Sequence, residues 1–114
     1  SWPAAALDAI VCINMIHISP WACTDALFDG ASRALRPGGV LFLYGPYRRE
    51  GRHTAPSNAA FDQQLRSRDP SWGVRDLEAV VALGLDRGLD CTEVIEMPAN
   101  NLSVVFRRLP HAEQ

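Results

Sequence analysis

The first long apolar run of the chain lies between Leu7 and Ile16. Nearly continuous apolar residues are typical of a strand that is covered on both faces, as in a parallel sheet with helices above and below it. Polar side chains gather where the run ends, at Asn14, His17 and Ser19. The pattern therefore predicts a buried strand with polar groups at its carboxyl end, which is where open α/β sheets bind ligands.

The residues that follow predict a strand–helix–strand unit. Residues 21–35 place apolar side chains at helical spacing, and Ser19 and Pro20 are suited to the helix cap and its first turn. A Pro-Gly-Gly sequence at 37–39 is a strong helix stop. Because residues 40–47 form a second apolar run, we expect two parallel strands joined by a right-handed crossover.

The second half predicts a polar loop, two helices and a hairpin. The loop covers residues 48–56, and a helix over 57–68 has Ala60, Phe61 and Leu65 as its apolar stripe. A turn at 69–73 leads to a second helix over 75–88. Two strands, 91–97 and 102–109, are joined by a short Pro-Ala-Asn-Asn turn and should pair antiparallel.

Composition limits the classes of function. The chain has 114 residues and a net charge of -2, so nothing draws it toward nucleic acid or anionic lipid. No apolar run reaches the ~18 residues of a membrane span. Three widely spaced cysteines, Cys12, Cys23 and Cys91, match no metal motif and indicate reduced, buried thiols in a cytoplasmic protein. We expect one partial domain over 1–110 and a tail over 111–114.

The order β-α-β-α-α-β-β, with the last two strands antiparallel, resembles a known α/β fold. It is similar to the carboxyl-terminal half of a class I S-adenosylmethionine (SAM)-dependent methyltransferase, strands 4 to 7 of a Rossmann-like seven-stranded sheet. The sequence Ala-Leu-Arg-Pro-Gly-Gly-Val-Leu over 34–41 is similar to the entrance to the fifth strand in that superfamily. The resemblance implies SAM as the cofactor of the full-length protein.

A narrower resemblance covers residues 7–108. The methyltransferase-like 26 family, once a domain of unknown function, has similar motifs in the same order. They are Asn-Met-Ile-His-Ile-Ser-Pro-Trp at 14–21, Leu-Tyr-Gly-Pro-Tyr at 43–47, Ser-Asn with Phe-Asp at 57–62, Arg-Asp-Pro-Ser-Trp-Gly-Val-Arg-Asp at 68–76 and Met-Pro-Ala-Asn-Asn at 97–101. Each motif alone is weak, but five in order are a specific match.

One feature of the superfamily is absent from the sequence. The glycine-rich loop after the first strand, which makes most contacts to SAM, has no counterpart among the eight glycines of this chain. The chain also begins without Met. The sequence therefore predicts a fragment of a longer enzyme that is inactive by itself, with a truncated relative that has lost activity as the alternative.

The resemblance places cofactor-binding residues at the end of the first predicted strand, at Asn14, Met15 and Ile16. Asn offers donors and an acceptor, which suits the amino-acid part of SAM. His17 and Tyr47 are the candidate catalytic residues, His17 as a general base that titrates near neutral pH and Tyr47 at the acceptor pocket. The alternatives are capping of the strand by Asn14 and His17, and core packing of Tyr47.

Four further residues are candidates for substrate binding: Arg48, Asn58, Arg75 and Asn100. Arginines suit a carboxylate or phosphate on the acceptor, with a solvated loop as the alternative for Arg48. Arg75 belongs to a predicted lid, or to a turn anchored by Arg-Asp pairs and Trp. Asn58 can cap a helix, and Asn100 can supply a left-handed turn residue.

Two functions remain open at this stage. The first is methyl transfer from SAM to an acceptor, most simply a small molecule, with no metal, nucleic acid or membrane involved. The second is a non-catalytic half-domain that associates through an exposed strand edge at 7–16, for example as a homodimer.

Overall fold

A computed structural model describes residues 7–110 of the chain. Residues 1–6 and the predicted tail at 111–114 lie outside the described residues. The elements in chain order are β1 (Leu7–Ile13), α1 (Trp21–Ala34), β2 (Leu35–Gly45), β3 (Arg48–Arg49), β4 (Arg52–His53), α2 (Pro56–Arg68), α3 (Leu77–Asp86), β5 (Leu89–Met97), the 3-10 turn η1 (Pro98–Asn100) and β6 (Asn101–Arg108).

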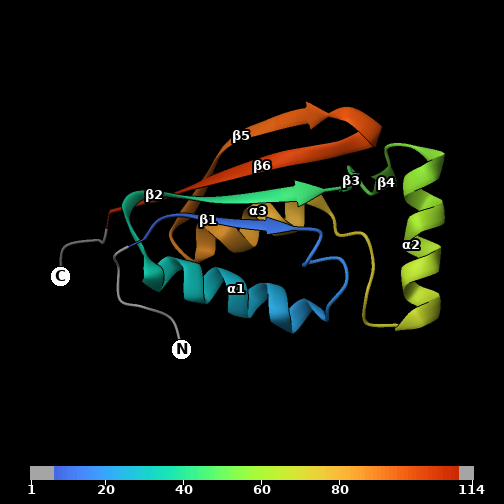
Figure 1. The fold of residues 1–114 in the computed structure, drawn as a ribbon, viewed down its shortest axis with the longest axis horizontal. Helices are drawn as coiled ribbons and strands as arrows, with labels where there is room; N and C mark the ends of the chain where they lie inside the picture. Colours follow the sequence, from blue (N-terminus) through green and yellow to red (C-terminus); the bar gives the residue numbers. More distant parts are fainter. Residues whose placement is uncertain (1–6, 111–114) are drawn as a thin grey trace.

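The main sheet has the strand order β1-β2-β6-β5 (Figure 1). Strands β1 and β2 are parallel, so the predicted strand–helix–strand unit is confirmed. Strands β5 and β6 form the predicted antiparallel hairpin, and β6 also pairs antiparallel with β2. The fold is α/β, and the order of its main elements is the predicted β-α-β-α-α-β-β with the short ribbon β3–β4 added.

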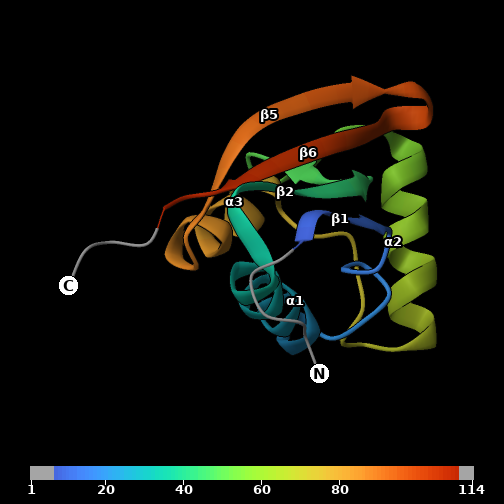
Figure 2. The same cartoon turned by 60° about the vertical axis from the view of Figure 1, so that its left-hand side comes forward.

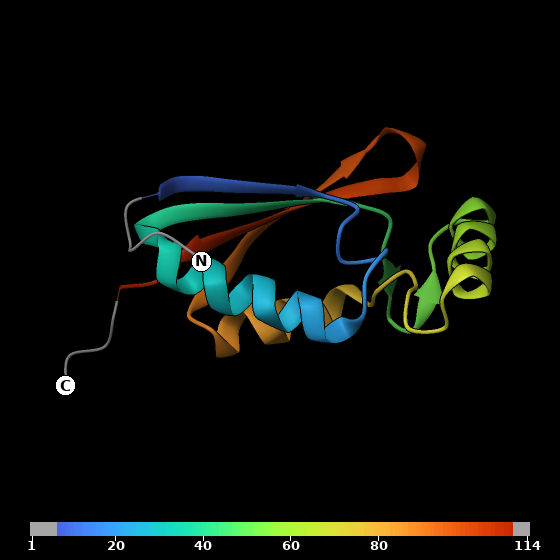
Figure 3. The ribbon, with the colours of Figure 1, turned by 60° about the horizontal axis from the view of Figure 1, so that its bottom comes forward.

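Helices α1 and α3 lie side by side against one face of the sheet (Figure 3). The core lies between these two helices and the strands. Phe28 of α1 meets Phe106 of β6 edge to face, with ring centroids 5.1 Å apart and both rings fully buried. Burial of each such ring is worth about 1.5–3 kcal/mol. The apolar side of residues 21–35 therefore holds α1 against the sheet at β6.

Strand β1 is shorter and more exposed than the sequence predicts. It ends at Ile13 and forms an edge of the sheet. Val11 and Ile13 are 62% and 63% exposed, because within residues 7–110 no helix covers the face opposite α1 and α3 (Figure 3). The prediction of a strand buried on both faces is therefore wrong for β1, whereas the exposed strand edge is confirmed.

Helix α2 stands across the end of the sheet, beyond the carboxyl ends of β1 and β2 (Figures 1 and 2). Its buried face carries Asn58, Asp62 and Leu65, whereas the predicted stripe residue Ala60 is exposed and Phe61 is half-buried. The apolar stripe was a wrong prediction at these two positions, because the inner face of α2 makes polar contacts rather than packing on the core.

Three local predictions also need correction. Pro20 rather than Ser19 is the N-cap of α1, and the Ser19 hydroxyl donates to the Met15 carbonyl at 2.7 Å. The predicted loop at 48–56 contains a short antiparallel ribbon, β3 and β4. The three cysteines are free thiols, but Cys23 is exposed and the other two are half-buried.

No helix within residues 7–110 is long and apolar enough to span a membrane.

Candidate functional site

The carboxyl ends of β1 and β2 bring Asn14 and His17 against Gly45. Asn14 follows β1 and has a left-handed backbone conformation, with a φ of 59°. Its main-chain N–H donates to the Tyr44 carbonyl at 2.8 Å. Asn tolerates this conformation better than most residues. A Cβ atom on Gly45 would lie only 2.7 Å from Asn14 Oδ1 and 3.0 Å from His17 Nε2. Gly45, which has no Cβ, therefore permits a close approach of two polar side chains.

His17 is fully buried in the turn between β1 and α1. Its Nδ1 accepts a hydrogen bond from the Arg75 amide at 3.1 Å, so the neutral ring carries its proton on Nε2. Burial, followed by the charge of Arg75, lowers the pKa of His17 to about 4. The ring is therefore neutral at pH 7, which differs from the expectation of titration near neutrality.

Tyr47 contacts His17 in an edge-to-face arrangement, with ring centroids 5.0 Å apart. It is 1% exposed and belongs to the hydrophobic core. Burial raises the pKa of its phenol well above the ordinary value. Within the described residues, its hydroxyl has no hydrogen-bond partner. The ring packs beneath the strand ends, in agreement with the packing alternative for this residue.

Two buried polar atoms at this point lack partners within residues 7–110: Asn14 Oδ1, an acceptor, and His17 Nε2, a donor. Both face the position above Gly45, as the short Cβ distances show. The other two expected cofactor residues differ from Asn14. Ile16 is 2% exposed and part of the core, and the Met15 carbonyl accepts the Ser19 hydroxyl. Only Asn14 among these three offers a free side-chain acceptor.

Arg75 fastens the segment before α3 to the turn after β1. Its guanidinium donates to three main-chain carbonyls, those of Ile16 at 2.9 Å, Ser19 at 2.6 Å and Ser71 at 2.9 Å. The same group lies 5.6 Å from the centroid of the Trp21 ring. The bonds to Ile16 and Ser19 join segments that are far apart in sequence and fix the turn that carries His17. Arg75 thus holds His17 in place through its side chain as well as through its main-chain N–H.

Asp62 of α2 provides a second link. Its carboxylate accepts from the Val74 amide at 2.8 Å and from Arg66 Nε at 3.0 Å, and it lies 3.4 Å from His53 Nε2. Burial acts to raise the pKa of Asp62, but the bonds from Val74 and Arg66 outweigh it, so the pKa lies below its ordinary value. The adjacent Gly73 amide donates to the His17 carbonyl at 2.9 Å. Helix α2 is thereby coupled to the turn after β1.

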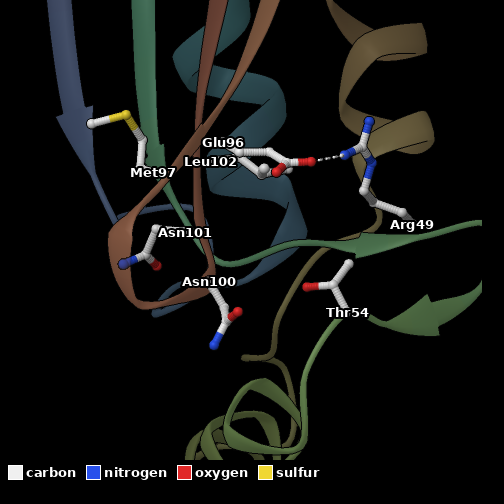
Figure 4. Close-up of a pocket in the computed structure, with 7 residues that line it drawn as sticks. All are labelled: Arg49, Thr54, Glu96, Met97, Asn100, Asn101 and Leu102. Atoms are coloured by element: carbon white, nitrogen blue, oxygen red, sulfur yellow. Dashed lines mark ion pairs between the residues drawn. The ribbon is translucent and has the colours of Figure 1, made fainter.

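A cavity of about 210 Å³ opens between β3, the β5–β6 turn and the start of α2 (Figure 4). Asn58 supports it from α2: its Nδ2 donates to Thr54 Oγ1 at 3.1 Å and to the Asn100 carbonyl at 3.2 Å. Asn100 itself has a positive φ of 62°. The lining residues are Arg49, Thr54, Glu96, Met97, Asn100, Asn101 and Leu102.

The four predicted substrate residues do not meet in one place. Asn100 lines the cavity of Figure 4, and Asn58 lies buried beside it. Arg48 and Arg75 line a different cavity. Consecutive residues of a strand point to opposite sides, so Arg49 faces the cavity of Figure 4 and Arg48 faces away from it. The pairing of Arg48 with Arg75 is therefore a feature of the tertiary structure.

Sequence reasoning missed Arg49, Thr54 and Asn101 as lining residues. The Nδ2 of Asn101 donates to the Tyr44 hydroxyl at 3.3 Å, which links the β5–β6 turn to the end of β2. The signal for Asn101 was present in the Pro-Ala-Asn-Asn motif, of which the sequence analysis named only Asn100 as a substrate-binding candidate. No local pattern indicates that residue 49 rather than residue 48 faces this cavity.

Comparison with protein families gives one match that covers residues 2–108. This family is described as "Protein of unknown function (DUF938)". The chain belongs to this family. The match extends over both strand ends, the cavity-lining turn and α2, so the candidate site lies wholly inside the shared region.

Solved structures show the same fold in O-methyltransferases. An O-methyltransferase family 2 protein from Planctomyces limnophilus, in complex with apigenin, aligns with a TM-score of 0.81 at 20% identity, covering 95% of this chain and 32% of its own. A putative O-methyltransferase from Nostoc punctiforme aligns at 0.80 and 17% identity, covering 92% and 33%. Human N-acetylserotonin methyltransferase in complex with SAM aligns at 0.77 and 14% identity, covering 90% and 30%.

The chain therefore spans about a third of the length of the solved structures that it matches. At these identities the similarity is one of fold. It supports a methyltransferase-like α/β architecture for residues 7–110.

Proposed function

We propose that these residues form the carboxyl-terminal part of a SAM-dependent methyltransferase. The observation that carries this proposal is the pair of unpartnered polar atoms, Asn14 Oδ1 and His17 Nε2, at the carboxyl ends of two parallel strands. This is the edge at which open α/β sheets bind ligands. The fold shared with O-methyltransferases supports the same assignment.

The residues at this edge fit one part of SAM. The amino group of its methionine portion is a hydrogen-bond donor, and Asn14 Oδ1 is a buried acceptor without a partner in the described chain. SAM, when bound, supplies the methyl group to be transferred. The part of Asn14 is to hold and orient the cofactor, since transfer of a sulfonium methyl depends chiefly on positioning.

We assign His17 a role as a neutral residue. Its low pKa of about 4 keeps the ring uncharged, with a proton on Nε2 that can be donated to a bound group. Tyr47 packs against this ring and limits its rotation. Neither residue needs to act as a general base, because positioning of the acceptor rather than proton removal limits many methyl transfers.

The acceptor side is best placed in the cavity of Figure 4. Hydroxyl and amide groups from Thr54, Asn100 and Asn101 line it, together with Arg49 and Glu96, whose charged groups lie 4.0 Å apart. A volume of about 210 Å³ suits a small molecule or one side of a larger acceptor. Net charge of -2 argues against a nucleic-acid acceptor.

Calorimetric titration with SAM and with its demethylated product tests the proposal. It is to be made on the longest gene product that contains these residues and on the 114-residue chain itself. We expect saturable binding that Asn14→Gly weakens about tenfold, the loss expected for a hydrogen bond to a charged group. Glycine keeps the left-handed backbone and removes the side-chain acceptor together with the rest of the Asn14 side chain.

Asn14→Asp is the matched control, because it retains an acceptor oxygen at the same position, and it should bind at least as well as the native chain. Absence of binding in both polypeptides would contradict the cofactor assignment. Binding that is unchanged by Asn14→Gly would contradict the role of Asn14.

Within the methyltransferases, we propose that the chain belongs to the methyltransferase-like 26 group. The five ordered motifs support this, and three of them contribute to the site: the turn after β1, the end of β2 and the β5–β6 turn. Three free thiols, one of them exposed, support a reducing, cytoplasmic location. Methylation assays with small-molecule extracts of the source cells would identify the acceptor.

A second function rests on a different observation. Strand β1 is an edge strand with exposed Val11 and Ile13, and exposed Ile95 and Met97 lie on β5. Unpaired edge strands of this kind pair readily with other chains. We propose that the 114-residue chain alone associates through β1, either with itself or with the remainder of a methyltransferase sheet.

A further inference from the structure

A second cavity, of about 170 Å³, lies on the other side of β3 from the cavity of Figure 4. Its volume is well above the ~10–15 Å³ of such space that one water molecule needs. Three arginines from separate parts of the chain reach it: Arg48 from β3, Arg66 from α2 and Arg75 from the segment before α3. The remaining lining residues are Trp21, Val74, Asp76 and Ala79.

The guanidinium groups outnumber the carboxylates beside them. Arg48 Nε lies 3.3 Å from Asp76 Oδ1, and Arg66 is paired with Asp62. Arg75, by contrast, is bonded to main-chain carbonyls, and among residues 7–110 no carboxylate forms an ion pair with it. Three guanidinium groups thus share two carboxylates, those of Asp62 and Asp76, so the cavity carries an excess of positive charge, and main-chain carbonyls fix the position of Arg75.

The local backbone adds to this positive potential. Trp21 is the first residue of α1, and Asp76 is the N-cap of α3, so the amino ends of two helices meet at the cavity. Each helix contributes a partial positive charge there. Neither N-cap makes a side-chain hydrogen bond to its helix.

We propose that this three-arginine cavity binds an oxyanion, a phosphate or carboxylate group of a small molecule, at a site separate from the methyl-acceptor cavity. Guanidinium groups bind both kinds of group through paired N–H donors. Trp21 supplies an apolar wall, and the carboxylate of Asp76 is the element that weakens binding. The site depends on the fold of the described residues and is independent of the proposed methyl transfer.

The test is an NMR titration of the 114-residue chain with sodium phosphate at pH 8, where the ion is mostly dianionic, with chloride added to keep ionic strength constant. We expect saturable shifts of the amide signals of Trp21, Arg48 and residues 74–79. A parallel titration with acetate distinguishes the two ligand groups: tighter binding of phosphate indicates a phosphate site, and equal or tighter binding of acetate indicates a carboxylate site.

Ala79 is exposed in the first turn of α3 and lines the cavity, which provides a matched set of variants. Ala79→Glu adds a carboxylate that occupies the arginines, and glutamate is favourable at this helix position. We expect it to abolish the saturable shifts, whereas the uncharged Ala79→Gln retains them. Ala82→Glu, on the same helix but outside the cavity, should also retain them.

Asp76→Asn gives the opposite change and keeps a good N-cap residue. Removing one negative charge beside the bound anion should tighten phosphate binding about fivefold to tenfold. The proposal is overturned by shifts that do not saturate, by equal effects of Ala79→Glu and Ala82→Glu, or by an Asp76→Asn chain that binds phosphate no better than the native one.

Discussion

The main-chain amide of Arg75 donates a hydrogen bond to Nδ1 of His17 at 3.1 Å. This bond fixes the tautomer of a histidine that is fully buried and holds it beside Asn14 and Gly45. It also requires an unprotonated Nδ1, so the folded state disfavours the imidazolium form. The geometry of the site is thereby linked to the protonation state of one residue.

The first prediction concerns pH. The pKa of His17 is about 4 in the folded chain and about 6.5 when unfolded, so the unfolded state binds more protons between these values. Stability should therefore be complete above pH ~6.5 and fall by about 3 kcal/mol as the pH drops to ~4, with no further loss from His17 below that.

Urea denaturation at pH 4 to 8, read by circular dichroism, measures this. His17→Asn, whose side-chain oxygen can accept the Arg75 amide, should show a flatter pH profile over the same range. Asp62, with its lowered pKa, adds a loss only at lower pH, as its carboxylate is protonated. A native profile that is flat between pH 4 and 6.5 would show that His17 protonates without disturbing the fold.

The second prediction concerns Arg75 as a structural link. Arg75→Ala removes three charged hydrogen bonds to the carbonyls of Ile16, Ser19 and Ser71 and should cost about 2–4 kcal/mol in the free energy of unfolding. Arg75→Lys should be less destabilising than Arg75→Ala but still less stable than the native chain, since lysine lacks the planar set of donors.

The matched control is Arg52→Ala, an exposed arginine in β4, which should change stability by less than about 0.5 kcal/mol. Chemical denaturation at pH 7 measures all three variants. Equal effects of Arg75→Ala and Arg52→Ala would count against the structural role of Arg75.

The third prediction concerns Gly45. Gly45→Ala places a methyl group 2.7 Å from Asn14 Oδ1 and 3.0 Å from His17 Nε2, so one of the two side chains must shift. We expect a loss of about 1–3 kcal/mol, as for other cases of overpacking. In the double variant, Asn14→Gly removes the clash with Asn14 Oδ1 and should restore part of the lost free energy of unfolding.

A double-mutant cycle of Gly45→Ala with Asn14→Gly measures that coupling. Additive effects would indicate that Asn14 moves away without cost, and that the close approach of the two residues does not constrain the site.

The fourth prediction concerns association through β1. At tens of micromolar, sedimentation velocity of the 114-residue chain should show dimers or larger species. Ile13→Lys places a charge on the exposed side of β1 and should shift the distribution toward monomer, because charges on an edge strand oppose pairing.

Leu85→Lys is the control, because Leu85 is similarly exposed, at 58%, but lies on α3. A monodisperse native monomer would rule out association through this edge. A similar response to both lysine substitutions would indicate association that is not specific to β1.

Much of the fold could be predicted because its signals are local. The apolar runs at 7–16 and 40–47 and the helix between them define the βαβ unit, which the structure confirms. The Pro-Gly-Gly sequence is not the end of the helix, however, because α1 ends at Ala34 and residues 37–39 lie inside β2. The Pro-Ala-Asn-Asn turn likewise predicts the antiparallel pairing of β5 and β6. The position of β6 between β2 and β5 has no such local signal.

The candidate site was predictable only in part. The strand-end position of Asn14 and His17 follows from the sequence, because polar residues directly after an apolar strand lie at the edge of the sheet. The burial of His17 and its low pKa do not, since they come from residues 73–75, more than fifty positions away. The buried polar face of α2, with Asn58 and Asp62, was hidden for the same reason.

The sequence by itself thus determined the element types, the βαβ unit, the hairpin and the polar edge, because propensity, apolar period and turn residues act over a few neighbouring positions. Tertiary structure decided which side chains meet. It placed Arg48 and Arg49 at different cavities and brought Arg66 and Arg75 beside Arg48. It also lowered the pKa of His17, so that the ring is neutral at pH 7. Those outcomes depend on contacts between distant segments, whose distances and burial exist only once the chain has folded.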